Sequence, residues 1–159
     1  MRNDQEPRAH PDNARVIAPP PAIFVAFLAL GYGAELFVPL SQVRETTWLG
    51  IGCVAVSIAA TLTCLLQFRQ AATAIEPWRP TTAIIERGLY RISRNPIYVA
   101  FALGHVGIAL IIHSLWMLLS VAPALVIVHY GVVLREETYL AAKFGNTYRD
   151  YQARVRRWL

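Results

Sequence analysis

The stretch Gly88-Leu-Tyr-Arg-Ile-Ser-Arg-Asn-Pro-Ile-Tyr98 marks the point where a basic loop enters an apolar helix. Arginine is costly to place in hydrocarbon, whereas the residues from Val99 onward are almost entirely apolar. We therefore expect a membrane boundary close to Asn95 and Pro96. Pro96 suits the first position of a helix, where its missing N–H would have no partner. The free amides of that first turn predict a site for a carboxylate or phosphate, together with Arg87, Arg91 and Arg94.

The composition indicates one integral membrane domain. Of the 159 residues, 55% are hydrophobic and only 16% are charged, which is too apolar for a soluble domain of this size. The net charge of +5 could indicate nucleic acid as a partner. The basic residues cluster beside apolar runs, however, so we expect anionic lipid headgroups and no nucleic acid.

Four apolar runs predict an all-α polytopic membrane protein with four transmembrane helices. The third run has 17 residues and would reach about 25 Å, a little short of the hydrocarbon thickness. Only His113 and Ser114 separate it from the fourth run, which predicts a tight antiparallel hairpin. The runs are Pro19 to Leu40, Trp48 to Phe68, Pro96 to Ile112, and Leu115 to Leu134.

Small residues predict where helices approach closely. In the second run, Gly50, Gly52, Ser57 and Ala60 allow close helix contact. In the hairpin, one face of the third run would meet one face of the fourth through Ala100, Gly104, Gly107, Ser120 and Ala124.

The remaining segments are expected on the cytoplasmic side. Residues 1–18 are polar and proline-containing and predict a disordered tail, so the membrane domain would be residues 19–159. Of the 15 lysines and arginines, only Arg44 lies in the first turn, which places both termini in the cytoplasm. Residues 135–159 carry an aromatic stripe at helical spacing, which Gly145 interrupts, and predict an amphipathic helix on the membrane surface.

The hairpin brings two polar stretches together at the cytoplasmic mouth. Equal helix depth places Tyr98 opposite His129, so residues 91–98 meet residues 129–137. The amides and arginines would bind an anion, while Glu136 and Glu137 would bind a cation. A zwitterion satisfies both, and S-adenosylmethionine has a carboxylate, an ammonium and a sulfonium.

Three motifs together resemble the isoprenylcysteine carboxyl methyltransferase and phospholipid methyltransferase superfamily. They are Gly88-Leu-Tyr-Arg-x-x-Arg-Asn-Pro-Ile-Tyr98, Arg135-Glu-Glu, and Phe144-Gly-x-x-Tyr148-x-x-Tyr151-x-x-x-Val155. The resemblance covers about residues 75–159, which would be the cofactor-binding half; the first half resembles the family only in having two apolar spans.

The resemblance implies S-adenosylmethionine as the cofactor, held at the cytoplasmic side. Glu136 or Glu137 would bind its amino group. The family's commonest form has histidine at the position of Asn95, which cannot titrate near neutrality, so a binding role is expected there rather than proton transfer. The other residues implied at the cofactor pocket are Ile84, Ile85, Tyr90, Arg94, Pro96, Ile97 and Tyr98. No metal is expected.

The implied reaction is methyl transfer to a lipophilic or membrane-embedded carboxylate, thiol or amine that enters from the bilayer. An amine or alcohol must also lose a proton, for which His129, Tyr98 and Glu136 are the nearest candidates. Arg135 could orient an anionic acceptor. In a bacterium the protein would lie in the inner membrane.

Three other functions are compatible with parts of the sequence. A small four-helix exporter would use Glu35 as its coupling carboxylate. An NADPH-dependent membrane reductase is possible because the C-terminal parts of sterol-type reductases are broadly similar. A non-catalytic membrane partner protein would bind no soluble cofactor. We expect His105, in the middle of a span, to form an interhelical hydrogen bond rather than to act in catalysis.

Overall fold

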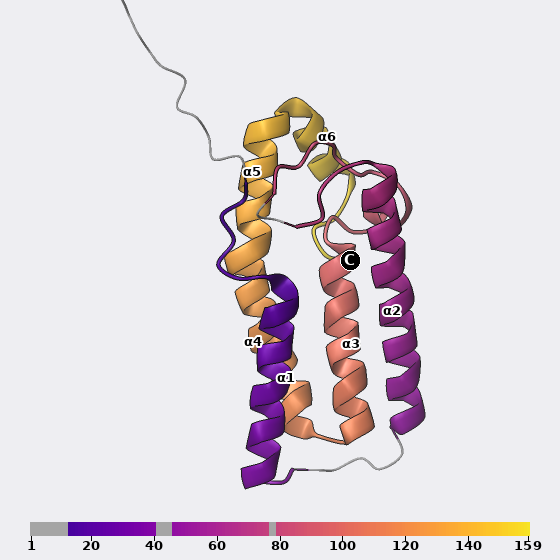
Figure 1. Cartoon of the computed structure of the whole chain (residues 1–159), viewed down its shortest axis with the longest axis vertical. Helices are drawn as coiled ribbons and strands as arrows, with labels where there is room; N and C mark the ends of the chain where they lie inside the picture. Colours follow the sequence, from indigo (N-terminus) through magenta and orange to yellow (C-terminus); the bar gives the residue numbers. More distant parts are fainter. Residues whose placement is uncertain (1–12, 41–45, 77–78) are drawn as a thin grey trace, which may run out of the picture.

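The computed structural model describes residues 13–40, 46–76 and 79–159, and within them the fold is all-α (Figure 1). The segment from Leu115 to Phe144 is one continuous helical run in which a π-helical turn joins two α-helices. The elements are α1 (Pro20–Phe37), α2 (Thr47–Gln70), the 3-10 helix η1 (Gly88–Arg91), α3 (Pro96–Ile112), α4 (Leu115–Val128), the π-helix η2 (His129–Val133), α5 (Leu134–Phe144) and α6 (Asn146–Arg154).

Three helical segments in the described part are long and apolar enough to cross a membrane: α1, α2 and Leu115–Phe144. The fourth apolar helix, α3, is shorter. Large apolar side chains on α1 and α2 point away from the protein, with Leu36 67% exposed and Trp48 82% exposed. Such surfaces are suited to lipid, because hydrocarbon carries no penalty for them. The prediction of an all-α protein with apolar membrane helices is confirmed.

Helix α3 packs mainly on α2, and α1 packs against α4 (Figure 1). The small residues of α3 lie in its contact with α2. A Cβ atom on Gly107 would lie 2.8 Å from the carbonyl oxygen of Gly50. About two turns away, the hydroxyl of Ser57 donates a 2.7 Å hydrogen bond to the carbonyl of Ala100. The prediction that this face of α3 meets α4 is therefore wrong. Helix α2 presents small side chains to α3, and these allow the two backbones to approach more closely.

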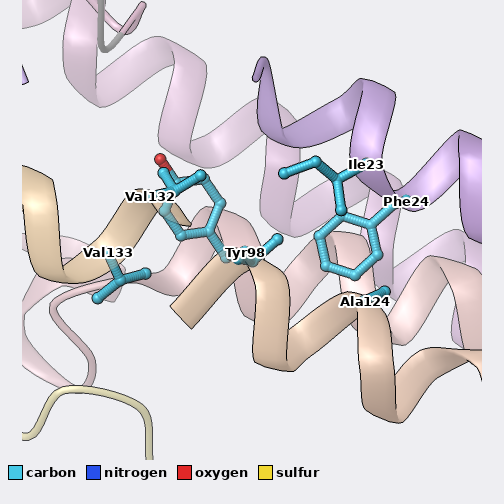
Figure 2. Packing of buried hydrophobic residues seen from close by; sticks show 7 residues of the cluster. Ile23, Phe24, Tyr98, Ala124, Val132 and Val133 are labelled. Atoms are coloured by element: carbon cyan, nitrogen blue, oxygen red, sulfur yellow. The ribbon is translucent and has the colours of Figure 1, made fainter. Parts of the chain in front are cut away.

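The small face of α4 packs instead against α1. Ala124 is fully buried in a cluster with Ile23 and Phe24 of α1, and Tyr98 of α3 belongs to the same cluster (Figure 2). His105 is also buried here, and its Nε2 lies 3.0 Å from the hydroxyl of Ser120. Its contact with α4 agrees with the interhelical role expected from the sequence.

The end of the bundle where α1 ends and α4 begins is closed by Glu35. Its Oε2 accepts a 2.7 Å hydrogen bond from the hydroxyl of Ser114, and its Oε1 accepts one from the backbone N–H of Leu40. His113 ends α3 in the left-handed conformation, with φ 58°, and turns the chain into α4. The turn lies where the sequence predicted it.

Residues 13–18 are not a free tail. The backbone N–H of Ile17 donates to the carbonyl of Gly131, and the Ile17 side chain fills the space left by the missing Cβ of Gly131. The carbonyl of Arg15 accepts a hydrogen bond from Arg135, and Ala14 is buried. The prediction of a disordered tail is thus wrong for residues 13–18, while residues 1–12 and Arg44 lie outside the described residues.

The predicted amphipathic helix consists of two helices. Gly145 separates α5 from α6 with φ 55°, a conformation in which glycine carries no Cβ penalty. After Arg154 the chain becomes extended and returns toward the start of α3. This return brings residues 155–158 beside the candidate site.

Candidate functional site

A cavity of about 370 Å³ lies at the end of the bundle where α2 ends and α3 begins. Its walls come from the start of α1, the end of α2, the connection before α3, the first two turns of α3, and from α5 and α6. It therefore joins segments from both halves of the chain.

Most of the residues that the resemblance implied at the cofactor pocket line this cavity. They are Ile84, Ile85, Tyr90, Arg94, Asn95, Ile97, Tyr98, Glu136 and Glu137. Pro96 does not line it: the residue is buried at the first position of α3, where it starts the helix.

Tyr98 and Glu136 join α3 to α5 across the cavity wall. The Tyr98 hydroxyl donates a 2.8 Å hydrogen bond to Oε1 of Glu136. The sequence placed Tyr98 opposite His129, about two helical turns away from this position. Side chains tilt toward the N-terminus of their own helix, and in this antiparallel pair the two tilts point toward each other. Tyr98 therefore contacts Glu136, which lies closer to the C-terminus of the second helix than His129, the residue at the backbone depth of Tyr98.

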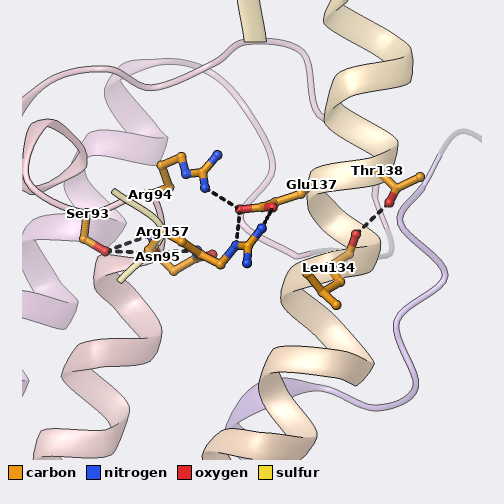
Figure 3. Close-up of polar contacts among 7 residues, drawn as sticks. All are labelled: Ser93, Arg94, Asn95, Leu134, Glu137, Thr138 and Arg157. Atoms are coloured by element: carbon orange, nitrogen blue, oxygen red, sulfur yellow. Dashed lines mark hydrogen bonds and ion pairs between the residues drawn. The ribbon is translucent and has the colours of Figure 1, made fainter. Parts of the chain in front are cut away.

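Glu137 is bound by two arginines from distant parts of the chain (Figure 3). Arg94 Nη2 lies 3.1 Å from its Oε1. Arg157 donates from Nε to Oε1 at 3.0 Å and from Nη2 to Oε2 at 2.8 Å. These hydrogen bonds raise the pKa of Arg157. The charge of Glu137 is thus compensated within the protein.

Glu136 differs from its neighbour in having no basic partner. Among the described residues, no lysine, arginine or histidine forms an ion pair with it, and it accepts a hydrogen bond from the Tyr98 hydroxyl. A carboxylate without a counter-ion in such a wall favours a cationic ligand. Of the two adjacent glutamates in the cavity wall, Glu137 is paired with arginines and Glu136 is not paired with a basic group of the described residues.

Arg94 places a positively charged guanidinium in the same cavity as the Glu136 carboxylate. Its side chain is 9% exposed and lines the cavity, and its Nε is buried without a hydrogen-bond partner. A buried N–H of a guanidinium favours an anion. Arg87 and Arg91 are exposed and do not line the cavity, so the predicted anion site of three arginines reduces to Arg94.

Three tyrosines outside the apolar helices complete the walls: Tyr90, Tyr148 and Tyr151. Burial raises the pKa of each, so all three stay neutral near pH 7. Tyr151 also donates a 2.8 Å hydrogen bond to the carbonyl of Tyr90 and fixes α6 to the η1 loop. From the sequence, Tyr148 and Tyr151 were assigned only to the aromatic stripe of an amphipathic helix. Their place in the third motif was the signal that they line the cavity.

The two predicted catalytic residues do not line the cavity. The ring of His129 lies 6.0 Å from that of Trp158 and 4.8 Å from that of Tyr130. Arg135 is exposed and donates to the carbonyl of Arg15 at 2.8 Å. Successive helix positions point about 100° apart, so Arg135 faces away from the wall that Glu136 forms. The contacts of these two residues are structural and give no support to a catalytic role.

A family model of phospholipid methyltransferases matches residues 46–147. The chain belongs to the phospholipid methyltransferase family. This confirms the resemblance noted from the three motifs, and the superfamily's cofactor is S-adenosylmethionine. The family match includes α2 to α5 and ends just before Tyr148.

A further comparison gives a short local match. An uncharacterized protein of Haemophilus influenzae is 46% identical over 41 residues, which are 26% of this chain and 65% of that protein. The chain therefore matches less than two thirds of that relative's length. No solved structure matches the chain.

Proposed function

We propose that this member of the phospholipid methyltransferase family transfers a methyl group from S-adenosylmethionine to a lipid acceptor. The observation that carries the proposal is the pairing in one cavity of a carboxylate without a counter-ion, Glu136, and a guanidinium with a free buried N–H, Arg94. Such a pair suits the ammonium and the carboxylate of an amino acid group.

The residues of the cavity fit the cofactor. Glu136 would bind its ammonium and Arg94 its carboxylate, while Ile84, Ile85 and Tyr90 provide an apolar surface for its adenosyl group. The bound cofactor supplies a methyl group on a positively charged sulfur, open to in-line attack by an acceptor's electron pair. The three neutral tyrosines would exclude water from the cavity. Because they are not phenolates, they would not themselves attack the methyl group on the sulfonium.

The acceptor would reach the cavity from the bilayer. On its bundle side the cavity is lined by residues of three apolar helices: Pro20 and Pro21 of α1, Thr61 and Leu65 of α2, and Phe101 of α3. Helices α1 and α2 flank α3 and pack mainly on α4 and α3 respectively (Figure 1). An acyl chain fits this apolar side, with the reacting headgroup directed toward Tyr98 and Glu136.

In this proposal all four apolar helices cross the membrane and both termini lie in the cytoplasm. Helix α3 spans about 25 Å, which suffices because its polar start at Arg94 and Asn95 lies at the headgroup level. Residues 19–159 then form one domain, placed in the inner membrane in a bacterium. The choice among amine, carboxylate and thiol acceptors depends on the lipid that the apolar side admits.

The proposal is tested by methyl transfer in vesicles. Purified protein is reconstituted with a bacterial lipid extract and supplied with S-adenosylmethionine labelled in its methyl group. We expect label in the organic phase, strongly reduced in Glu136→Gln and retained in Arg135→Gln, which changes the exposed neighbour. Absence of labelled lipid with the wild-type protein, or full labelling by Glu136→Gln, would refute the proposal.

A further inference from the structure

Residues 156 and 157 pair with the segment that leads into α3. The carbonyl of Arg156 accepts a 2.9 Å hydrogen bond from the backbone N–H of Arg94, and Ser93 and Arg156 form an isolated parallel bridge. The carbonyl of Arg157 accepts from Asn95 Nδ2 at 2.9 Å and from the Ser93 hydroxyl at 3.3 Å. The backbone here is therefore bonded to one wall of the cavity.

The side chain of Arg157 binds the opposite wall. Its guanidinium forms a bidentate pair with Glu137, a residue of α5 that is adjacent to Glu136 (Figure 3). One residue thus connects the start of α3, through its carbonyl, to α5, through its side chain. Arg157 lies outside the residues matched by the family model, which end at residue 147.

We propose that Arg157 is a positioning residue for cofactor binding, acting through Glu137 and Asn95 to hold the two cavity walls at the separation that S-adenosylmethionine requires. The inference rests on the proposed function. Bidentate arginine–carboxylate pairs fix relative orientation as well as distance. Here the pair fixes α5, and with it the direction of Glu136.

Arg157 also leaves Arg94 available to the cofactor. Glu137 is 10% exposed in its side chain, and it receives two donors from Arg157 but one contact from Arg94. Without the Arg157 guanidinium, Arg94 would be the remaining cation beside this carboxylate. It would then be drawn toward Glu137 and away from the cavity, so the ligand would lose its anion-binding group.

The test measures the dissociation constant of S-adenosylmethionine by calorimetry in detergent. We expect Arg157→Ala to weaken binding by about tenfold or more. The dissociation constant of Arg157→Lys should lie between those of the wild type and Arg157→Ala, because an ammonium keeps the charge but not the bidentate geometry. The matched control is Arg156→Ala, which should bind as the wild type does, because the exposed Arg156 contributes through its backbone carbonyl.

Glu137 provides a second criterion. If Arg157 acts through Glu137, the double variant Arg157→Ala, Glu137→Gln should bind the cofactor no more weakly than the worse single variant. A role in stability alone would lower the active fraction but leave the dissociation constant of the folded protein unchanged. Wild-type affinity in Arg157→Ala would overturn the inference, and Arg157→Lys applies the same criterion if the alanine variant does not fold.

A measurement without cofactor separates this inference from the proposed function. Hydrogen–deuterium exchange of residues 93–99 should be faster in Arg157→Ala than in Arg156→Ala, because the α3 entry loses its link to α5. If the wild-type protein bound no S-adenosylmethionine, the proposed function would fail and the cofactor role with it. Unchanged exchange would show instead that Arg157 does not connect the walls.

Discussion

The Tyr98 hydroxyl donates a 2.8 Å hydrogen bond to Glu136, and this bond fixes a cavity carboxylate that forms no ion pair within the described part of the chain. Tyr98 belongs to the same buried cluster as Ile23, Phe24 and Val132, and its ring lies beside Val132 (Figure 2). The orientation of a polar group in the site therefore depends on the apolar core between α1 and α4.

Removing this bond should affect both stability and binding. We expect Tyr98→Phe to lower the free energy of unfolding by about 2 kcal/mol, the range for a hydrogen bond to a charged group, and to weaken cofactor binding. Thermal unfolding in detergent measures the first effect. Tyr130→Phe is the control, since Tyr130 is 65% exposed on η2; equal stability of the two variants would contradict the assignment.

The two adjacent glutamates should respond in opposite ways. Glu137→Gln leaves Arg94 and Arg157 without their shared carboxylate, so the free energy of unfolding should fall by roughly 3 kcal/mol. Glu136→Gln removes a carboxylate that has no basic partner in residues 13–40, 46–76 and 79–159, so it should leave the unliganded protein at least as stable as the wild type. The midpoints of thermal unfolding without cofactor check this. A larger loss in Glu136→Gln than in Glu137→Gln would show that the roles are reversed.

The contact between α2 and α3 should tolerate no added methyl group. In Gly107→Ala the new Cβ would lie 2.8 Å from the carbonyl oxygen of Gly50, so the helices must separate and the melting temperature should fall. Gly52→Ala is the matched control, because no atom lies within 4 Å of a Cβ there, and alanine favours the helix. If Gly107→Ala melted at or above the temperature of Gly52→Ala, the close packing would be refuted.

Glu35 should contribute to stability and not to activity. It accepts hydrogen bonds from Ser114 and Leu40 at the end of the bundle away from the cavity. We expect Glu35→Gln to cost about 1 kcal/mol in stability and to keep lipid methylation within about twofold of the wild type. Vesicle methylation assays with protein matched for folded content measure this. Loss of activity in the folded variant would revive the idea of a functional carboxylate in α1.

The sequence predicted the helices and the meeting of Tyr98 with the Glu136 region because both depend on local patterns, namely apolar runs and a short turn at His113. It misassigned the partner of Gly104 and Gly107, because small residues show that a helix can be approached closely but not by which neighbour. Asn95 was recognised by motif, whereas its partner Arg157 was missed. That pairing depends on the chain turning back after Arg154, and no periodicity in the sequence reports such a return.

His129 and Arg135 illustrate the same limit. Their distance in sequence from Glu136 is short, but the face of a helix that borders a cavity depends on neighbouring elements. Residues 13–18 pack on Gly131 and occupy the surface beside Arg135. This packing could not be predicted either, because the segment is polar and contains proline.

The central claim is that Glu136, held by Tyr98 and without a basic partner among the described residues, binds the ammonium of S-adenosylmethionine. The most direct measurement is the shift in unfolding free energy that the cofactor produces in wild-type protein and in Glu136→Gln. At a hundred times the dissociation constant the wild type should gain about 2.7 kcal/mol, and Glu136→Gln should gain far less at the same concentration. An equal gain in both proteins would contradict the account.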